Sequence, residues 1–191
     1  YTIDPTTGVI TFQPNKDFVG TPDAAKVVAK DTNGTKVETT YTPTVTPVVP
    51  TAEPKETTGK QGQPQTQETE SMFKQGDEVA PIDKTTVKLV DPSGNEVTTM
   101  PALKDGKEVG TYTIDPTTGV ITFQPNKDFV GTPDAAKVVA KDTNGTKVET
   151  TYTPTVTPVT PIAEPKETTG KQGQPQTQET ESMFKQGDEV A

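Results

Sequence analysis

Two side chains that can bind a cation, Asp142 and Asn144, stand at alternate positions in the run KDTNGT. A calcium loop of the EF-hand type also needs further oxygen ligands at alternating positions and a late bidentate glutamate, which this run lacks. The same residues are typical of a tight turn, because Asp and Asn bond to their own backbone and Gly accepts a positive φ. We therefore predict a turn that holds no metal ion.

Asp115 and Asp128 offer the paired carboxylates that hydrolytic enzymes use. Each borders a turn marked by Pro or Gly, where a carboxylate is normally solvated, so we predict turn residues and no catalytic pair. Asn33 and Asn144 each satisfy the glycosylation pattern N-x-[ST], and here too a turn is the favoured interpretation.

Lys88, on a predicted strand, and Asn126, in a predicted loop, have the residue types that form covalent links in some stalk domains. Lys and Asn are common residues that are rarely buried unless paired, so their presence alone does not predict such a link. We expect no bond between them.

The composition excludes several classes of function. Neither Cys nor His occurs, which removes disulfides, thiol catalysis, histidine bases and zinc sites built from these residues. The net charge is −9 and all 18 basic residues are Lys. Neither nucleic acid nor an anionic membrane surface is therefore an expected partner. No catalytic, cofactor-binding or metal-binding residues emerge, and we predict that the protein is not an enzyme.

An internal repeat dominates the sequence. Residues 1–80 recur as residues 112–191, an offset of 111, and only two of these 80 positions differ: Val49 against Thr160, and Thr51 against Ile162. Such near-identity indicates an array of similar units, each folding by itself or with its neighbours. A fibre uses many copies of one spacer, whereas an enzyme rarely needs adjacent copies of one site.

Closely spaced Pro residues in Tyr41–Pro54 and Tyr152–Pro165 predict stiff, extended linkers. They divide the chain into the C-terminal half of a repeat (1–50), a complete repeat (51–160) and the N-terminal part of a third (161–191). Because the chain opens in mid-pattern, we expect it to be a piece of a longer protein. Neither end piece carries the equivalent of residues 81–111, so both are expected to be weakly ordered alone.

Short apolar runs separated by turn residues every 8–12 positions predict an all-β fold of tandem, sandwich-like antiparallel domains joined by Pro-rich linkers. The expected strands are Gln65–Phe73, Thr85–Val90, Glu96–Met100, Val109–Ile114, Val120–Phe123, Lys137–Lys141 and Lys147–Tyr152. Phe129 is expected to cap a small core. The other core candidates are Val87, Leu89, Val97, Leu103, Tyr112, Ile114, Ile121, Phe123, Val138, Ala140, Val148 and Tyr152.

Several linked motifs occur in a fixed order. Gly110–Gly131 reads GTYTIDPTTGVITFQPNKDFVG, and it is followed by KDTNGT at Lys141–Thr146 and YTPTVTPV at Tyr152–Val159. This order closely resembles the CshA-type fibril repeats of streptococcal surface adhesins. Lys74–Asp83 and Gly170–Phe184 are similar to the start of such a repeat.

The resemblance implies a fibrillar adhesin of Gram-positive bacteria that is anchored in the cell wall. In that family, tandem repeats form a stalk and a separate N-terminal region does most of the ligand binding. Neighbouring repeats are then the expected partners. The alternative is a module that itself binds a host extracellular-matrix protein or another cell surface. With aromatics at 5% and no Trp or Arg, the usual hot-spot residues are scarce, which favours the spacer.

Overall fold

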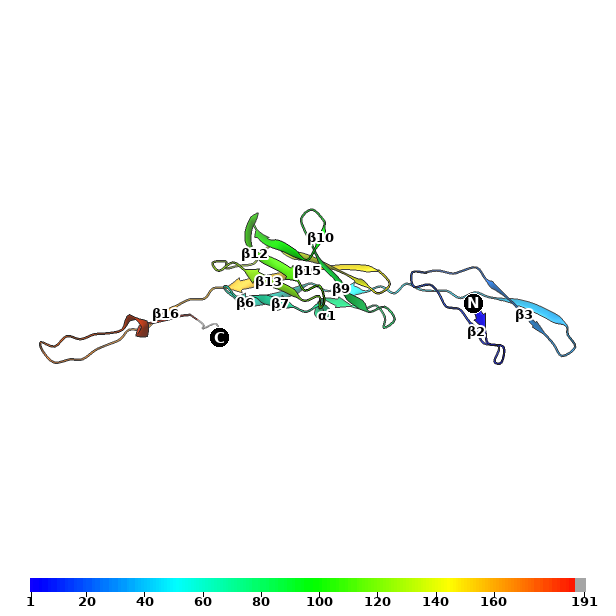
Figure 1. The fold of residues 1–191 in the computed structure, drawn as a ribbon, viewed down its shortest axis with the longest axis horizontal. Helices are drawn as coiled ribbons and strands as arrows, with labels where there is room; N and C mark the ends of the chain where they lie inside the picture. The colour runs from blue at the N-terminus through cyan, green and yellow to red at the C-terminus, as the bar shows by residue number, and fades with distance from the viewer. Residues whose placement is uncertain (188–191) are drawn as a thin grey trace.

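The computed structural model describes residues 1–187 and shows a nearly all-β chain. An N-terminal piece, a two-sheet body and a C-terminal piece follow one another along the long axis (Figure 1). The end pieces contain β1 (Thr2–Ile3), β2 (Ile10–Thr11), β3 (Ala25–Lys30), β4 (Lys36–Tyr41), β16 (Ile162–Ala163), the 3-10 helix η1 (Thr180–Ser182) and β17 (Phe184–Lys185).

The body is built from eleven strands and one helix among the described residues. They are β5 (Thr51–Ala52), β6 (Lys55–Lys60), β7 (Gln65–Gln67), α1 (Thr69–Met72), β8 (Phe73–Lys74), β9 (Ile82–Val90), β10 (Glu96–Val97), β11 (Thr99–Lys104), β12 (Lys107–Ile114), β13 (Ile121–Pro125), β14 (Ala136–Asp142) and β15 (Lys147–Thr157).

Two sheets of the body pack face to face, which confirms the predicted all-β, sandwich-like fold. One has the strand order β10-β9-β14-β15-β6 and the other β11-β12-β13-β7. Neighbouring strands are antiparallel, with the exception of β15 and β6, which are parallel. Both sheets contribute buried side chains to one cluster, all of whose buried members lie between Met72 and Val156.

Aromatic rings join the two sheets at the centre of this core. Tyr112 on β12 has its ring centroid 5.1 Å from that of Phe123 on β13 and 6.2 Å from that of Tyr152 on the opposite sheet. The Tyr112 hydroxyl donates to the Asp134 carbonyl at 3.3 Å, and burial raises the pKa of this phenol well above its usual value. A ring pair across the sheets fixes their spacing as well as burying apolar area.

Two tight turns connect neighbouring strands of the body. Asp105 and Gly106 both have positive φ, 51° and 75°, as a two-residue hairpin between β11 and β12 requires. Asp91 accepts a hydrogen bond from the backbone N–H of Ser93 at 2.9 Å, which closes the turn between β9 and β10.

The strand prediction is wrong at Gln65–Phe73. This stretch divides into β7, the single helical turn α1 and β8. The helical turn buries Met72 and Thr69, and the Thr69 hydroxyl donates to the Gly119 carbonyl at 2.8 Å. A tertiary contact 50 residues away thus overrides the weak strand preference of the segment.

The linker prediction is wrong for the first part of Tyr152–Pro165. Strand β15 continues to Thr157 and pairs with β6, and Pro154 within it is buried. Pro lacks an N–H but can still pack its ring and accept through its carbonyl, so a Pro-rich run can lie in a sheet. This parallel pair is an exception to the antiparallel pairing that the other described strands share.

Most predicted core residues are buried, and Val97, Phe129 and Val148 are partly buried against the cluster. Leu103 is the exception. A register shift between Ala102 and Leu103 buries Ala102 and leaves Leu103 half-buried at the edge of β11. The prediction also missed the buried residues Met72, Phe73, Ala80, Ala102, Ala136, Val139 and Val156.

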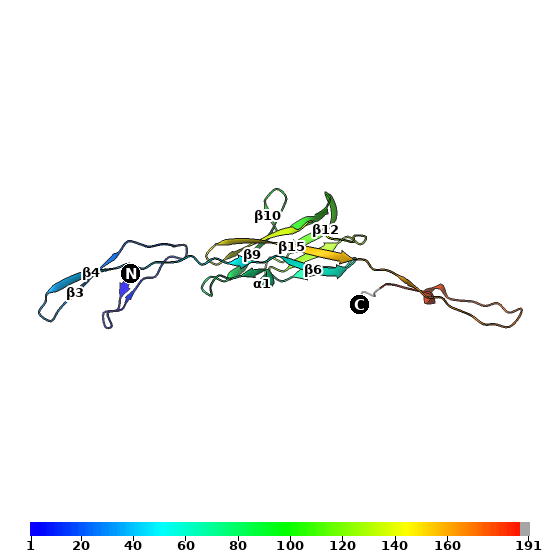
Figure 2. The ribbon, with the colours of Figure 1, turned by 180° about the vertical axis from the view of Figure 1, so that it is seen from behind.

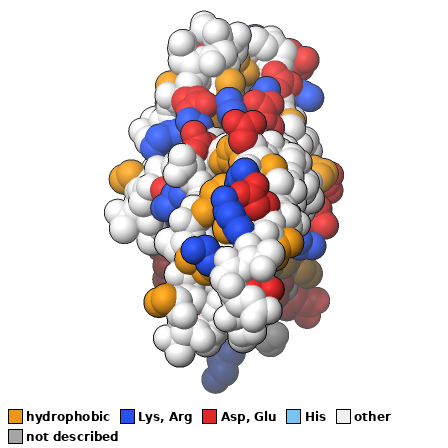
Figure 3. Space-filling view, turned by 90° about the vertical axis from the view of Figure 1, so that its right-hand side faces the viewer, with side chains coloured by type: hydrophobic (Ala, Val, Ile, Leu, Met, Phe, Trp, Pro, Cys, Tyr) orange, Lys and Arg blue, Asp and Glu red, His pale blue; other side chains and the backbone are white. Residues whose placement is uncertain are grey.

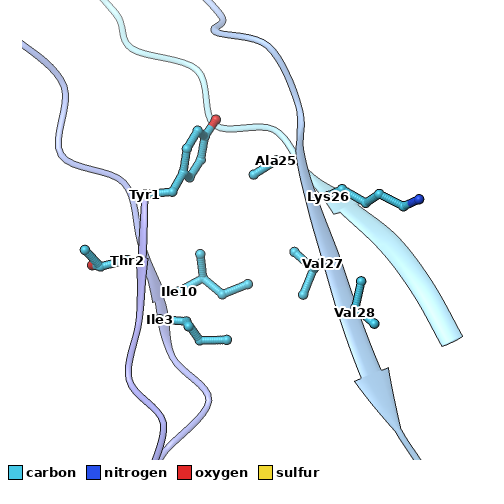
Figure 4. Close-up of a pocket in the computed structure, with 8 residues that line it drawn as sticks. All are labelled: Tyr1, Thr2, Ile3, Ile10, Ala25, Lys26, Val27 and Val28. Carbon is cyan, nitrogen blue, oxygen red and sulfur yellow. The ribbon is translucent and has the colours of Figure 1, made fainter. Parts of the chain in front are cut away.

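The N-terminal piece leaves the same side chains open. Tyr1 and Ile3 are 49% and 58% exposed, whereas their counterparts Tyr112 and Ile114 are 1% and 5% exposed. Figure 4 shows Ile3 and Ile10 facing Val27 across an open hollow. In the complete repeat, the equivalent positions belong to the buried cluster, to which β9 and β11 also contribute side chains.

Candidate functional site

The first and last long strands of the body, β6 and β15, lie side by side and point the same way (Figure 2). Their pairing runs from Tyr152 with Lys55 to Thr157 with Lys60. The chain therefore enters the body ahead of Lys55 at one end of this pair and leaves it after Thr157 at the other. A pull on the two ends of the repeat would shear the strands and load their evenly spaced hydrogen bonds together.

A buried polar network ties this strand pair to the second sheet. Gln65 on β7 donates from Nε2 to the Thr155 carbonyl on β15 at 3.0 Å. Its Oε1 accepts from the Thr57 hydroxyl on β6 at 2.6 Å, and that hydroxyl also lies 2.7 Å from the Tyr152 hydroxyl. Burial raises the pKa of Tyr152, so this phenol stays neutral and can share the network. The network thereby holds the three strands β6, β7 and β15 in one register.

Gly59 on β6 makes room for Gln65. A Cβ at position 59 would lie 2.7 Å from the Gln65 Cγ, closer than real side chains approach. At the exit end, the Thr157 hydroxyl donates to the Gly59 carbonyl at 3.1 Å, and the Gln61 N–H donates to the Thr157 carbonyl at 2.9 Å. The strand pair is thus closed at its end by bonds from both partners.

Sequence reasoning did not identify this network. A Gln between the exposed Pro64 and Thr66 hints at an inward-pointing position, but period-2 alternation over three residues is a weak signal. Nothing in the local sequence shows that Gln65 meets Thr155, which is 90 positions away.

The suspected calcium residues form a turn, as predicted. Asp142 accepts hydrogen bonds through Oδ1 from the N–H groups of Asn144 at 3.0 Å and Thr146 at 2.7 Å. Its Oδ2 is buried without a hydrogen-bond partner. Among residues 1–187, no three Asp, Glu, His or Cys side chains gather closely enough to hold a metal ion. Asn33 lies in the equivalent turn, where its N–H donates to Asp31 at 2.9 Å.

Asp115 and Asp128 are not brought together. They occupy turns at opposite ends of β13. Asp115 accepts from the N–H groups of Thr117 and Thr118, both at 2.8 Å, and these bonds, that of Thr118 first, lower the pKa of its carboxyl group. This geometry stabilises a turn and provides no acid–base pair.

Lys88 and Asn126 belong to different sheets. Lys88 lies on β9, opposite Val139 of β14. Asn126 follows β13, and its side-chain amide donates to the Glu108 carbonyl at 3.2 Å. Lys88 and Asn126 thus have separate partners in the body.

The sequence of the chain matches one family of surface proteins. A family model described as the surface adhesin CshA repetitive domain matches residues 1–45 and 47–156. The chain belongs to this family. The resemblance inferred from the motifs is confirmed, and the chain is a tandem repeat segment of a surface adhesin, a family of adhesive and structural proteins. No curated protein matches it.

The two matched segments end at Val45 and Val156, equivalent positions of successive CshA repeats. Each of these residues exchanges a pair of backbone hydrogen bonds with a glycine, Gly20 or Gly131. Within the described part of the chain, no helix has the length and apolar character needed to span a membrane.

Proposed function

We propose that these CshA repeats are the stalk of a fibrillar adhesin that is anchored in the cell wall of a Gram-positive bacterium and carries an adhesive tip away from it. The parallel pairing of β6 and β15 is the observation that supports this most strongly. A stalk transmits tension from tip to wall, and this topology places the strand pair directly in the path of the force. The network around Gln65 braces the same strands from the other sheet.

The surface of the complete repeat also fits a spacer. Among residues 52–160, the exposed large hydrophobic side chains are Val79 at 75% and Val130 at 45%. They lie at opposite ends of the body, and they are single residues rather than a patch. Figure 3 looks along the chain from its N-terminal end, and on the piece that lies in front, acidic and basic side chains are intermingled with apolar ones. A surface of this kind favours solubility over capture of a protein partner.

Attachment under flow tests the proposal. Beads would carry one, two or four repeats in tandem with a biotin at the far end, and would be passed over a streptavidin surface. If the repeats act as a spacer, the beads should attach through the biotin, and the distance between bead and surface should increase with each added repeat. The same beads without biotin should retain no more matrix protein or host cells than bare beads. Saturable capture by the repeats alone would instead support the alternative of a binding module.

A further inference from the structure

The segment between two repeats is held to both of them. On the preceding side, Val45 and Gly20 exchange two backbone hydrogen bonds, each 2.9 Å long. On the following side, β5 pairs with β8, matching Thr51 with Lys74, and the Glu53 N–H then donates to the Met72 carbonyl at 2.9 Å. Few residues remain between these anchors, and one of them is Pro47, which restricts its own φ.

A glycine in the following repeat lies against this segment. A Cβ on Gly76 would approach the carbonyl oxygen of Val49 far inside contact distance and would lie 2.8 Å from the Val49 nitrogen. Gly76 has no positive φ, so its backbone conformation is open to any residue. The nearby backbone of Val49 is therefore the feature that requires glycine here.

The second junction repeats this contact. β16 pairs with β17, and a Cβ on Gly187 would lie 2.8 Å from the Thr160 nitrogen. Both positions at which the two copies differ, 49/160 and 51/162, fall within these junctions. The side chains of Val49 and Ile162 are 59% and 55% exposed. A contact made through the backbone explains how Val and Thr can both occupy the position against glycine.

Apolar and polar residues of both repeats line the same hollow beside the junction. Its volume is about 280 Å³. The preceding repeat contributes Phe18, Val19, Val45 and Val48, and the following one Val79, Thr143 and Asn144. Val19 is the counterpart of Val130, so the two exposed hydrophobic positions of a complete repeat belong to the two sides of this contact.

We infer that consecutive repeats dock head to tail, and that the connecting segment packs its backbone against Gly76 of the following repeat. The occupant of this surface is the preceding repeat of the same chain. Such a contact is heterologous and propagates from one repeat to the next. This contact restricts bending between successive repeats. Its biological role rests on the proposed stalk function.

Backbone relaxation by NMR on the 191-residue chain tests the contact between Gly76 and the connecting segment. Because the copies differ at positions 49 and 51, the amides of Val49 and Thr51 give signals distinct from those of the second junction. In the unaltered chain we expect order parameters S² of about 0.8 or more at both amides, close to those of β9. Gly76→Ala should lower both to about 0.6 or less. Gln75→Ala, an exposed neighbour, should leave them unchanged.

Amide chemical shifts of β12 and β14 report whether the body of Gly76→Ala remains folded. Low S² at Val49 and Thr51 in the unaltered chain would overturn the inference whatever the variant does. Unchanged S² in a folded Gly76→Ala would overturn the role of this glycine. Neither result bears on bead attachment, because a loosely jointed stalk could still carry a tip, so the two proposals fail separately.

Discussion

Ile114→Ala and Ile3→Ala form a matched pair of perturbations. Both residues lie in the same sequence, YTIDPTTG, and both pair across a short hairpin with an identical partner, Ile121 or Ile10. Their burial differs: Ile114 is 5% exposed in the complete repeat, and Ile3 is 58% exposed in the half repeat. The comparison therefore separates the sandwich core from local strand pairing.

The expected magnitudes follow from this difference. Truncating a buried Ile costs about 2–5 kcal/mol, because transfer free energy is lost and a cavity remains. Full burial of an Ile contributes about 1.5–3 kcal/mol, so a side chain that keeps more than half its exposure should cost about 1 kcal/mol or less. In urea, with a slope of about 1–3 kcal/mol per M, Ile114→Ala should lower the unfolding midpoint by at least about 0.7 M.

Far-UV circular dichroism during urea unfolding of the whole chain provides the assay. Ile3→Ala should leave the main transition within about 0.5 M of its original midpoint, since the core that unfolds there does not include it. Equal shifts for the two variants would refute the reasoning. That result would mean that the half repeat carries a core as cooperative as that of the complete one.

Three further predictions concern the network, the junction and the turn. Gln65→Ala should lower the free energy of unfolding by about 2–3 kcal/mol, from two lost hydrogen bonds and a small cavity, while Thr66→Ala should stay within about 0.5 kcal/mol; equal losses in denaturant titrations would contradict this. Lys74 and then Lys55 lower the pKa of Glu53 below its usual 4.5. The stability that these ion pairs add to the β5–β8 contact is therefore present above that value and lost as pH falls through the lowered pKa. Amide exchange at position 51, corrected for intrinsic rates, should be faster at pH 3 than at pH 7, and equal protection would count against the ion pairs. Millimolar calcium should leave the melting temperature of the chain unchanged, and a rise of several degrees that chelation reverses would show that the turn at Asp142 binds the ion.

Much of the fold could be predicted because its turns carry local signals. Asp105-Gly106 predicts a hairpin, and the run VITF predicts β13, since Gly conformation and β-branched packing act over a few residues. The bulge that exchanges Ala102 for Leu103 was not predictable, because it arises from pairing with β12. The helical turn α1 likewise depends on Gly119, far away in the sequence.

The candidate site was beyond sequence reasoning for the same physical reason. Each residue of the network around Gln65 is ordinary in its own segment, and its role exists only once β6 and β15 lie side by side. The Pro residues suggested a linker where the structure has a strand, because a sequence shows the missing N–H of Pro154 but not the packing of its ring. The turns at Asp115 and Asp142 are confirmed. They could be predicted because an Asx turn forms between residues only a few positions apart.

Small-angle X-ray scattering on proteins of one, two and four tandem repeats tests the stalk most directly. Docked repeats predict a maximum dimension that increases by the same increment with each added repeat, and a cross-section that does not change. A flexible chain of beads would instead lengthen roughly as the square root of repeat number. Growth of that kind would contradict the docking of successive repeats, and collapse of four repeats into a compact globule would contradict the stalk itself.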